Sequence, residues 1–170
     1  MESLFCCPVC REQLQREERS YRCSRGHSYD IAKEGYVNLL PANFRHSASP
    51  GDDREMVAAR TKFLDGGWYE PLRDRLCELS ERNSGAGSVL LDAGCGEGYY
   101  TAALSDSISR RGGQTLGVDL SKAAVRRAAN AVPLLRLPWV PSTVCPWQMP
   151  QSTSWSTASH HWRQRNSAGF

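Results

Sequence analysis

The sequence predicts an α/β protein made of a small metal-binding module followed by the first half of a parallel sheet with its helices. Three observations support this prediction. Two pairs of metal-ligand residues stand near the N-terminus, Cys7 with Cys10 and Cys23 with His27. Strand and helix patterns alternate over residues 88–130, which favours parallel strands joined by crossover helices. Residues 131–170 follow neither pattern.

The overall composition limits the class of protein. The chain has 170 residues, with 21 basic against 18 acidic side chains and a net charge of +3. No apolar run approaches the roughly 18 residues that cross a bilayer, and the first residues lack the basic start and apolar core of a signal peptide. We therefore expect a cytosolic protein whose cysteines stay reduced. The small positive charge permits an RNA partner without arguing for one.

The cysteine spacing predicts a zinc site in residues 1–40. Each pair, Cys7 with Cys10 and Cys23 with His27, places two ligands on one tight turn, and zinc takes four such ligands in a tetrahedron. Cys6, next to Cys7, is not one of the four predicted ligands. Four protein ligands leave no open position for water, so the predicted role is structural. A module this short needs a bound metal ion, or a comparable cross-link, in order to fold. The alternative is a small core of reduced cysteines with the histidine at the surface.

Residues 41–84 are predicted to form a linker and two packing helices. The linker ends near Gly51, and Asp52 or Asp53 can cap the first helix. Pro71 suits the first turn of the second helix. One face of each helix carries apolar residues at helical spacing. These are Met56, Ala59, Phe63 and Leu64 in the first helix, and Leu72, Leu76 and Leu79 in the second.

Residues 85–130 are predicted to form two strand-and-helix units. Apolar runs at 88–92 and 115–119 read as the strands. The helix after the first strand places Tyr100, Leu104 and Ile108 on one face. Ser121 can cap the helix after the second strand. Two strands alone would leave the edges and faces of the sheet exposed, which is the physical argument for an unstable fragment.

A glycine-rich loop, Asp92-Ala93-Gly94-Cys95-Gly96-Glu97-Gly98, joins the first strand to its helix. Glycines let the backbone turn sharply and let a ligand approach, while free amides at the start of the helix face that ligand. The G-x-G-x-G spacing, with an acid two residues before it, differs from the dinucleotide spacing. It favours S-adenosylmethionine, with NAD or a ligand-free turn as alternatives. Asp119 ends the second strand, where its carboxylate can accept hydrogen bonds from ribose hydroxyls.

Residues 131–170 hold Pro133, Pro138 and Pro141 where a third strand would run, together with most of the tryptophans and no acidic residue. We hypothesise that a frameshift or a gene-model error produced this stretch, and we expect it to form an aberrant, disordered tail. An RNA-binding extension is the alternative, although basic residues are sparse here.

The glycine loop resembles motif I of the class I, Rossmann-like S-adenosylmethionine methyltransferases. Its pairing with the zinc ligands is similar to the bacterial 23S rRNA (guanine-N1)-methyltransferases. The resemblance covers about residues 4–130. Other segments that carry it are Ala32-Lys33-Glu34-Gly35-Tyr36-Val37-Asn38-Leu39-Leu40-Pro41, Pro50-Gly51-Asp52, Ala59-Arg60, Pro71-Leu72-Arg73-Asp74 and Val118-Asp119-Leu120-Ser121.

The resemblance implies a ribbon-like zinc domain over residues 1–40 that helps to hold an rRNA hairpin. It also implies the N-terminal half of a Rossmann-like catalytic domain over residues 85–130, which moves a methyl group to guanine N1. The implied donor-binding residues are Asp92, Gly94, Gly96, Glu97 and Gly98 in the loop, Asp119 at the ribose, and Tyr69 closing over the donor.

Several points stay open at this stage. No residue can be assigned to the proton on guanine N1, so the catalytic residues are unknown. Tyr36, Phe44, Arg45 and Arg60 are candidate RNA contacts, with ordinary surface or packing roles as the alternative. A zinc-containing RNA-binding fragment without catalysis is the alternative function. Whether two copies form a homodimer is also left open.

Overall fold

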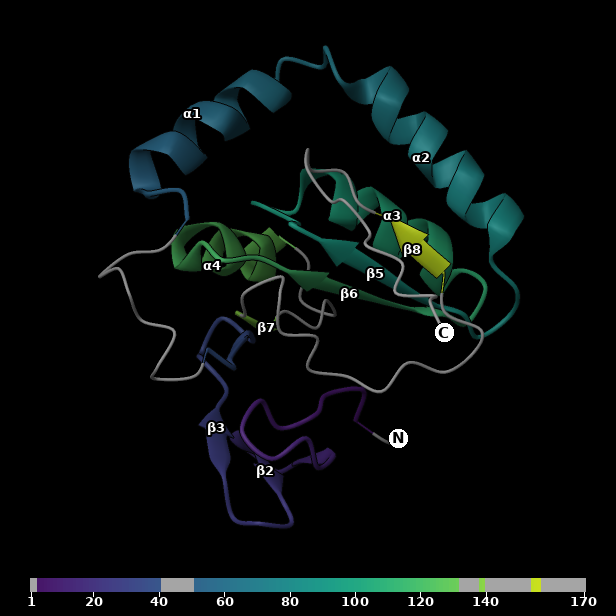
Figure 1. Cartoon of the computed structure of the whole chain (residues 1–170). Coiled ribbons are helices and arrows are strands. Elements are labelled where there is room, and N and C mark those ends of the chain that lie inside the picture. The colour runs from purple at the N-terminus through teal and green to yellow at the C-terminus, as the bar shows by residue number, and fades with distance from the viewer. Residues whose placement is uncertain (1–2, 41–50, 132–137, 140–153, 157–170) are drawn as a thin grey trace, which may run out of the picture.

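The computed structural model describes residues 3–40, 51–131, 138–139 and 154–156. A module of short strands lies on one side of a parallel sheet, and the helices lie on the other side (Figure 1). In the described part of the chain, no helix combines the length and apolar character that a membrane crossing requires.

The N-terminal module is an antiparallel sheet of β1 (Leu14–Arg16), β2 (Ser20–Cys23) and β3 (Ser28–Asp30), with β2 in the centre. The ring centroids of Phe5 and Tyr21 lie 5.1 Å apart, edge to face, in its small core. Strand β4 (Val37–Asn38) follows and pairs in parallel with β7 (Pro138–Trp139).

The second sheet contains the two predicted strands, β5 (Val89–Ala93) and β6 (Gln114–Val118), which pair in parallel. A third strand, β8 (Ser154–Ser156), lies in parallel on the other side of β5. The expectation that residues 131–170 add nothing to the fold is thus corrected at β7 and β8. A parallel edge offers unpaired amides and carbonyls, so any extended segment that reaches it can pair there. The disordered tail that we expected otherwise falls outside the described residues.

The described residues also form four helices: α1 (Arg54–Leu64), α2 (Glu70–Asn83), α3 (Tyr99–Ser109) and α4 (Lys122–Ala131). Two predicted caps are confirmed. The Asp53 carboxylate accepts a hydrogen bond from the Met56 amide at 2.8 Å, and the Ser121 hydroxyl accepts one from the Ala124 amide at 3.1 Å. Helices α1 and α2 arch over α4 and α3 (Figure 1).

The buried faces of the helices match the prediction only in part. Leu104 and Ile108 of α3 pack against Leu90 of β5, as expected. In α1, however, the predicted face was only partly right, because Leu64 is buried but Met56 and Phe63 are more than half exposed. Its buried residues are Val57, Thr61 and Leu64. They share a different stripe of the helix, since α1 packs against α4.

The N-terminal module covers the second face of the β5–β6 sheet. Leu91, Leu116 and Val118 belong to the same buried cluster as Phe5 and Leu39. Leu90 points to the opposite face, where it meets α3. Both faces are therefore buried, which removes the physical argument for an unstable pair of strands.

Candidate metal centre and cofactor site

The four predicted metal ligands, Cys7, Cys10, Cys23 and His27, converge in the N-terminal module, and their ligand atoms all lie within 4.8 Å of one another. The Sγ atoms of Cys10 and Cys23 are 3.6 Å apart. His27 Nδ1 lies 3.3 Å from Cys23 Sγ and 3.5 Å from Cys7 Sγ. A tetrahedron with Zn–S bonds of about 2.3 Å has edges of about 3.8 Å, so the four atoms fit one zinc ion.

Two tight turns hold these ligands. The Cys7 carbonyl accepts a hydrogen bond from the Arg11 amide at 2.8 Å, and Arg11 has a φ of 66°. In the second turn the Cys23 carbonyl accepts one from the Gly26 amide at 2.9 Å. Burial raises the pKa of the Cys7 thiol, but hydrogen bonds outweigh burial, that of Tyr29 first, and lower it to about 7. The thiolate that a metal requires is thus favoured.

The glycine loop lies at the carboxyl ends of β5 and β6, where parallel sheets bind ligands. Gly94, Gly96 and Gly98 have φ values of 92°, 55° and 91°, a left-handed region that side chains rarely adopt. The amides of Gly94 and Cys95 both donate to the Val118 carbonyl, at 2.7 and 2.9 Å. The loop therefore folds back over the end of β6.

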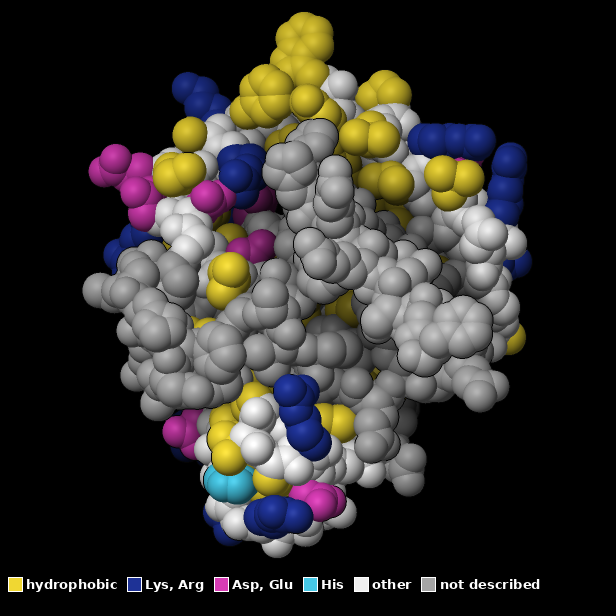
Figure 2. Space-filling view, in the orientation of Figure 1, with side chains coloured by type: hydrophobic (Ala, Val, Ile, Leu, Met, Phe, Trp, Pro, Cys, Tyr) yellow, Lys and Arg dark blue, Asp and Glu magenta, His cyan; other side chains and the backbone are white. Residues whose placement is uncertain are grey.

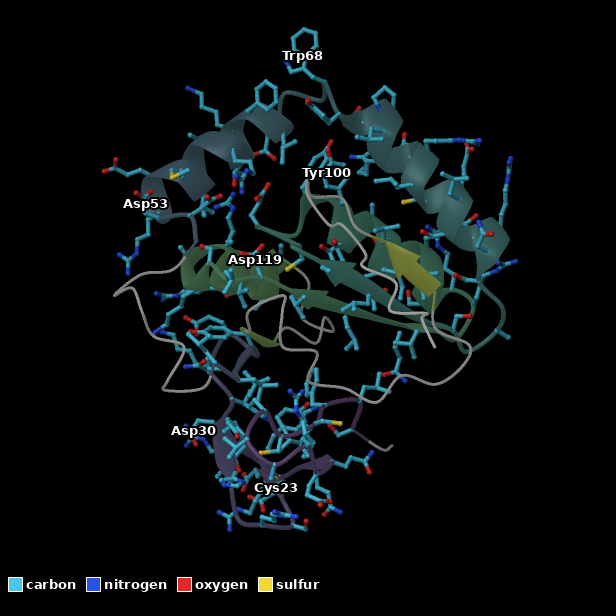
Figure 3. The ribbon with its side chains drawn as sticks, viewed as in Figure 1. Cys23, Asp30, Asp53, Trp68, Tyr100 and Asp119 are labelled. Carbon is cyan, nitrogen blue, oxygen red and sulfur yellow. The ribbon has the colours of Figure 1, made fainter. Side chains whose placement is uncertain are left out.

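Asp119 anchors this loop. One carboxylate oxygen accepts a hydrogen bond from the Gly96 amide at 2.9 Å, and the other accepts one from the Ser121 amide at 2.7 Å. Each oxygen keeps a second acceptor position, which leaves room for the ribose hydroxyls expected there. Asp119 and Cys23 lie in different parts of the molecule, so the metal centre and the loop are separate sites (Figure 3).

Asp92 lies buried beneath the loop, with 1% of its surface exposed. Its Oδ2 accepts a hydrogen bond from the Thr101 hydroxyl at 2.6 Å, whereas Oδ1 has no hydrogen-bond partner among the described residues. Burial raises the pKa of Asp92 to about 6, the Thr101 hydrogen bond opposes this shift, and the Asp119 charge adds to it. A buried acceptor without a partner is rare in proteins, so a ligand donor beside the loop would satisfy it.

The raised pKa of Asp92 predicts a specific pH dependence of stability. Its carboxyl group loses its proton near pH 3.8 in the unfolded chain but near 6 in the folded one. The folded state is therefore favoured below pH 3.8, and this advantage of about 3 kcal/mol is lost as the pH rises through 6. We expect the free energy of unfolding of Asp92→Asn, minus that of the parent, to rise by this amount between about pH 4 and pH 7.

Urea unfolding across this range measures that difference. Because both chains carry the same metal ligands, their titration cancels in the subtraction. A difference that stays constant with pH would show that the carboxyl group of Asp92 titrates alike in the folded and unfolded chains.

Glu97 and Arg60 form a charged cover on the loop. Burial raises the pKa of Glu97, and the positive charges of Arg60 and Arg127 oppose this shift. The guanidinium of Arg60 pairs with Asp52 at 2.5 Å and lies 3.9 Å from the place that a Cβ on Gly96 would occupy. Arg60 thus contacts the cofactor site. No local sequence pattern indicates this position, because α1 reaches the loop only through the tertiary fold.

The segment before α1 packs on the turn after β6. The Ser121 hydroxyl donates to the Asp52 carbonyl at 2.5 Å. A Cβ on Gly51, whose φ is 80°, would lie only 2.7 Å from the Ser121 amide nitrogen. This close approach requires glycine, and it packs the segment before α1 against the Asp119 turn.

The donor-binding candidate Tyr69 and the RNA-contact candidate Tyr36 lie in different surroundings. Tyr69 precedes α2 and stacks edge to face on Phe63, with ring centroids 5.7 Å apart. Burial raises the pKa of Tyr100, and Tyr69 adds to this shift, which places Tyr69 near the first turn of α3. Tyr36 is buried against Cys95, which makes it a packing residue and not a surface contact. Phe44 and Arg45 fall outside the described residues.

Comparisons with protein families match both parts of the chain. Residues 5–48 match the zinc-ribbon family described as "RlmA, N-terminal". Residues 91–153 match a family described as "Methyltransferase domain", and this match extends beyond residue 130, where the resemblance was expected to stop. The α/β fold with an N-terminal zinc ribbon is thus confirmed.

The chain is also similar to curated proteins that are named as established or putative 23S rRNA guanine-N1 methyltransferases. The chain is 42% identical over 129 residues to "23S rRNA (guanine(748)-N(1))-methyltransferase" of Streptomyces fradiae, covering 75% of this chain and 44% of the relative. It is 39% identical over 145 residues to a putative 23S rRNA (guanine-N(1)-)-methyltransferase of Micromonospora griseorubida, with coverages of 75% and 48%. For YxjB of Bacillus subtilis, also a putative 23S rRNA (guanine-N(1)-)-methyltransferase, the identity is 33% over 135 residues, with coverages of 76% and 46%. The chain spans about half the length of the curated relatives that it matches.

These matches agree with the chemistry of the two sites. A methyltransferase domain implies S-adenosylmethionine as cofactor. The left-handed conformation of the glycine loop, and the Asp92 Oδ1 that has no hydrogen-bond partner among the described residues, fit that group. A zinc ribbon implies one structural zinc ion, and the four ligand atoms fit it.

Proposed function

Because this chain belongs to the 23S rRNA (guanine-N1)-methyltransferase family and spans about half of its relatives' length, we propose that it carries the zinc and donor sites of an enzyme that methylates guanine N1 in a 23S rRNA hairpin. The observation that carries this proposal is the left-handed glycine loop tied to Asp119 through the Gly96 amide. This arrangement suits a ligand with a ribose and a flexible charged tail.

The described residues have distinct tasks in this proposal. When bound, S-adenosylmethionine supplies an electrophilic methyl group on its sulfonium sulfur. Gly94, Gly96 and Gly98 let the backbone approach the donor, and Asp119 accepts hydrogen bonds from the ribose hydroxyls. Asp92 and Glu97 place acidic groups at the loop, and Tyr69 covers the donor from the start of α2.

The protein's main catalytic contribution is alignment, because the methyl carbon must be held in line with guanine N1 at near-attack distance. A base must also remove or redirect the N1 proton. Among the described residues we assign none to this role. The target base is reached in an unpaired loop or by flipping it out of its stack. The N-terminal zinc domain is proposed to help hold the hairpin.

The proposal also concerns location and assembly. Reduced metal-ligand cysteines and an rRNA substrate both favour the cytoplasm. The sequence leaves open whether two copies form a homodimer, and the half-exposed Leu72 and Leu79 of α2 are apolar positions that a second copy could cover. Sedimentation at several protein concentrations measures this association.

Isothermal titration with S-adenosylmethionine, followed by transfer of a labelled methyl group to unmodified 23S rRNA, tests the proposed function. We expect donor binding by the parent chain and its loss in Asp119→Ala, because that carboxylate holds both the loop and the ribose. Arg75→Ala on α2 is the control and should bind the donor normally, since Arg75 is exposed and forms its ion pair with Glu78 of the same helix, away from the loop. RNA binding without donor binding by the parent would instead support a zinc-containing RNA-binding fragment without catalysis.

A further inference from the structure

A groove runs between α1 and α4, and it shares Arg127 with the surroundings of Glu97 at the glycine loop. It consists of two hollows of about 410 and 250 Å³. The hollows share Ala58 and Arg127 in their walls, so they form one continuous surface feature. We call it the α1–α4 groove. Its other lining residues are Arg54, Val57, Thr61, Lys62, Asp65, Gly66, Ala123, Arg126 and Asn130.

The α1–α4 groove is basic. Four cationic side chains line it, Arg54, Lys62, Arg126 and Arg127, against one acidic side chain, Asp65. Arg126 pairs with Glu34 of the N-terminal module at 2.7 Å. The other three cations take part in none of the ion pairs found among the described residues. Arg127 acts on Glu97 of the glycine loop, so the charges of Arg54 and Lys62 are the ones available to an anionic partner.

Exposed aromatic side chains stand at one end of the α1–α4 groove. Gly66 lines the groove, and a Cβ there would lie 3.1 Å from Nε1 of Trp68, so the indole reaches back to the groove wall. Trp68 is 77% exposed and projects from the turn between α1 and α2 (Figure 3). Phe63 is 55% exposed, and Figure 2 shows apolar side chains gathered over this turn.

Building on the proposed function, we propose that the α1–α4 groove binds a strand of the substrate RNA, with its cations on the phosphates and Trp68 stacked on an unpaired base. A positive groove that tracks the backbone, combined with an aromatic platform for bases, is the arrangement with which proteins hold single-stranded nucleic acid. An acidic protein would match the charge, but only some of its side chains are planar, whereas every nucleotide carries a planar base that can stack on the indole.

The experiment measures fluorescence anisotropy of a labelled RNA hairpin with an unpaired loop of mixed sequence, titrated with the full chain at several salt concentrations. Arg54 and Lys62 are both exposed and lie on α1, so Arg54→Ala/Lys62→Ala removes charge from the groove alone. Arg75→Ala/Arg82→Ala on α2 is the control with the same change of charge.

We expect the groove variant to bind the RNA more weakly and to lower the slope of log affinity against log salt by about 1.4, the value for two phosphate contacts on a single strand. The α2 control should leave both quantities unchanged. Trp68→Ala should weaken binding about ten-fold with no change in the salt slope, because stacking releases no counterions. Equal effects of the two double variants, or none in either, would overturn the proposal.

Two further readouts separate this inference from the proposed function. Donor binding by the groove variant is measured in parallel and should match that of the parent. If the parent fails to bind the donor but the groove variant still weakens RNA binding, the proposed enzymatic function is wrong, and the proposed RNA-binding role of the α1–α4 groove is retained. If poly-glutamate displaces the RNA as well as unlabelled RNA does, the groove attracts any polyanion and the inference fails.

Discussion

The Cys23→Ser variant is expected to lose its zinc and to unfold the N-terminal module. In small zinc domains the free energy of metal binding, about 10–16 kcal/mol, is also the free energy of folding. Cys23 supplies one ligand and also belongs to the buried core of the module. That core includes Leu91 and Leu116 of the sheet, so the damage should extend to the β5–β6 face. Zinc content per chain and thermal unfolding by circular dichroism measure both effects.

Cys77→Ser is the matched control for this prediction. Cys77 lies half-buried on α2, packed against the Leu90 cluster and outside the metal site. The control should retain one zinc ion per chain and a cooperative unfolding transition. Removing zinc from the parent with a chelator should reproduce the Cys23→Ser result. A Cys23→Ser chain that holds zinc and melts as the parent does would exclude the structural role of the site.

The features that the sequence predicted correctly depend on short stretches of chain. A zinc turn needs only two residues with a fixed gap, so Cys7 and Cys10 could be recognised without any tertiary information. The caps at Asp53 and Ser121 involve amides three residues further on. Two parallel strands followed from the order of apolar runs and helices.

The features that were missed depend on contacts between distant segments. The apolar pattern of α1 suggested a face with Phe63, but α4 buries the stripe with Val57 instead. Nothing in residues 3–40 indicates that this module covers one face of the sheet, because its apolar residues suit its own core equally well. Arg60 was considered as an RNA contact, yet its pairing with Asp52 places it over the glycine loop.

One long-range contact links the two sites. Tyr36, which follows the module's last turn, is buried with Cys95 of the glycine loop and Ala128 of α4. Glu34 of the same turn pairs with Arg126 of α4. The N-terminal module thus packs against the glycine loop and α4. The position of the loop therefore depends on that module as well as on β5 and β6.

The Gly98→Ala variant is expected to combine backbone strain with a steric clash at the cofactor site. Gly98 has a φ of 91°, which costs an alanine about 1–2 kcal/mol. An added Cβ would also lie 3.0 Å from the Ala128 Cβ and 3.2 Å from its Cα. Both are tight contacts between the start of α3 and the middle of α4, and overpacking of this kind costs about 1–3 kcal/mol. We therefore expect a loss of about 3 kcal/mol in the free energy of unfolding.

Gly112→Ala separates the two causes, because Gly112 also has a left-handed φ, of 72°, but no atom of the described residues lies within 4 Å of its Cβ position. That variant should lose only the strain energy and should bind S-adenosylmethionine as the parent does. Gly98→Ala should bind the donor more weakly, since α3 must move away from α4 and takes the loop with it. Urea unfolding and isothermal titration of both variants measure this. Equal losses of stability and unchanged donor binding would mean that the contact between Gly98 and Ala128 does not position the loop.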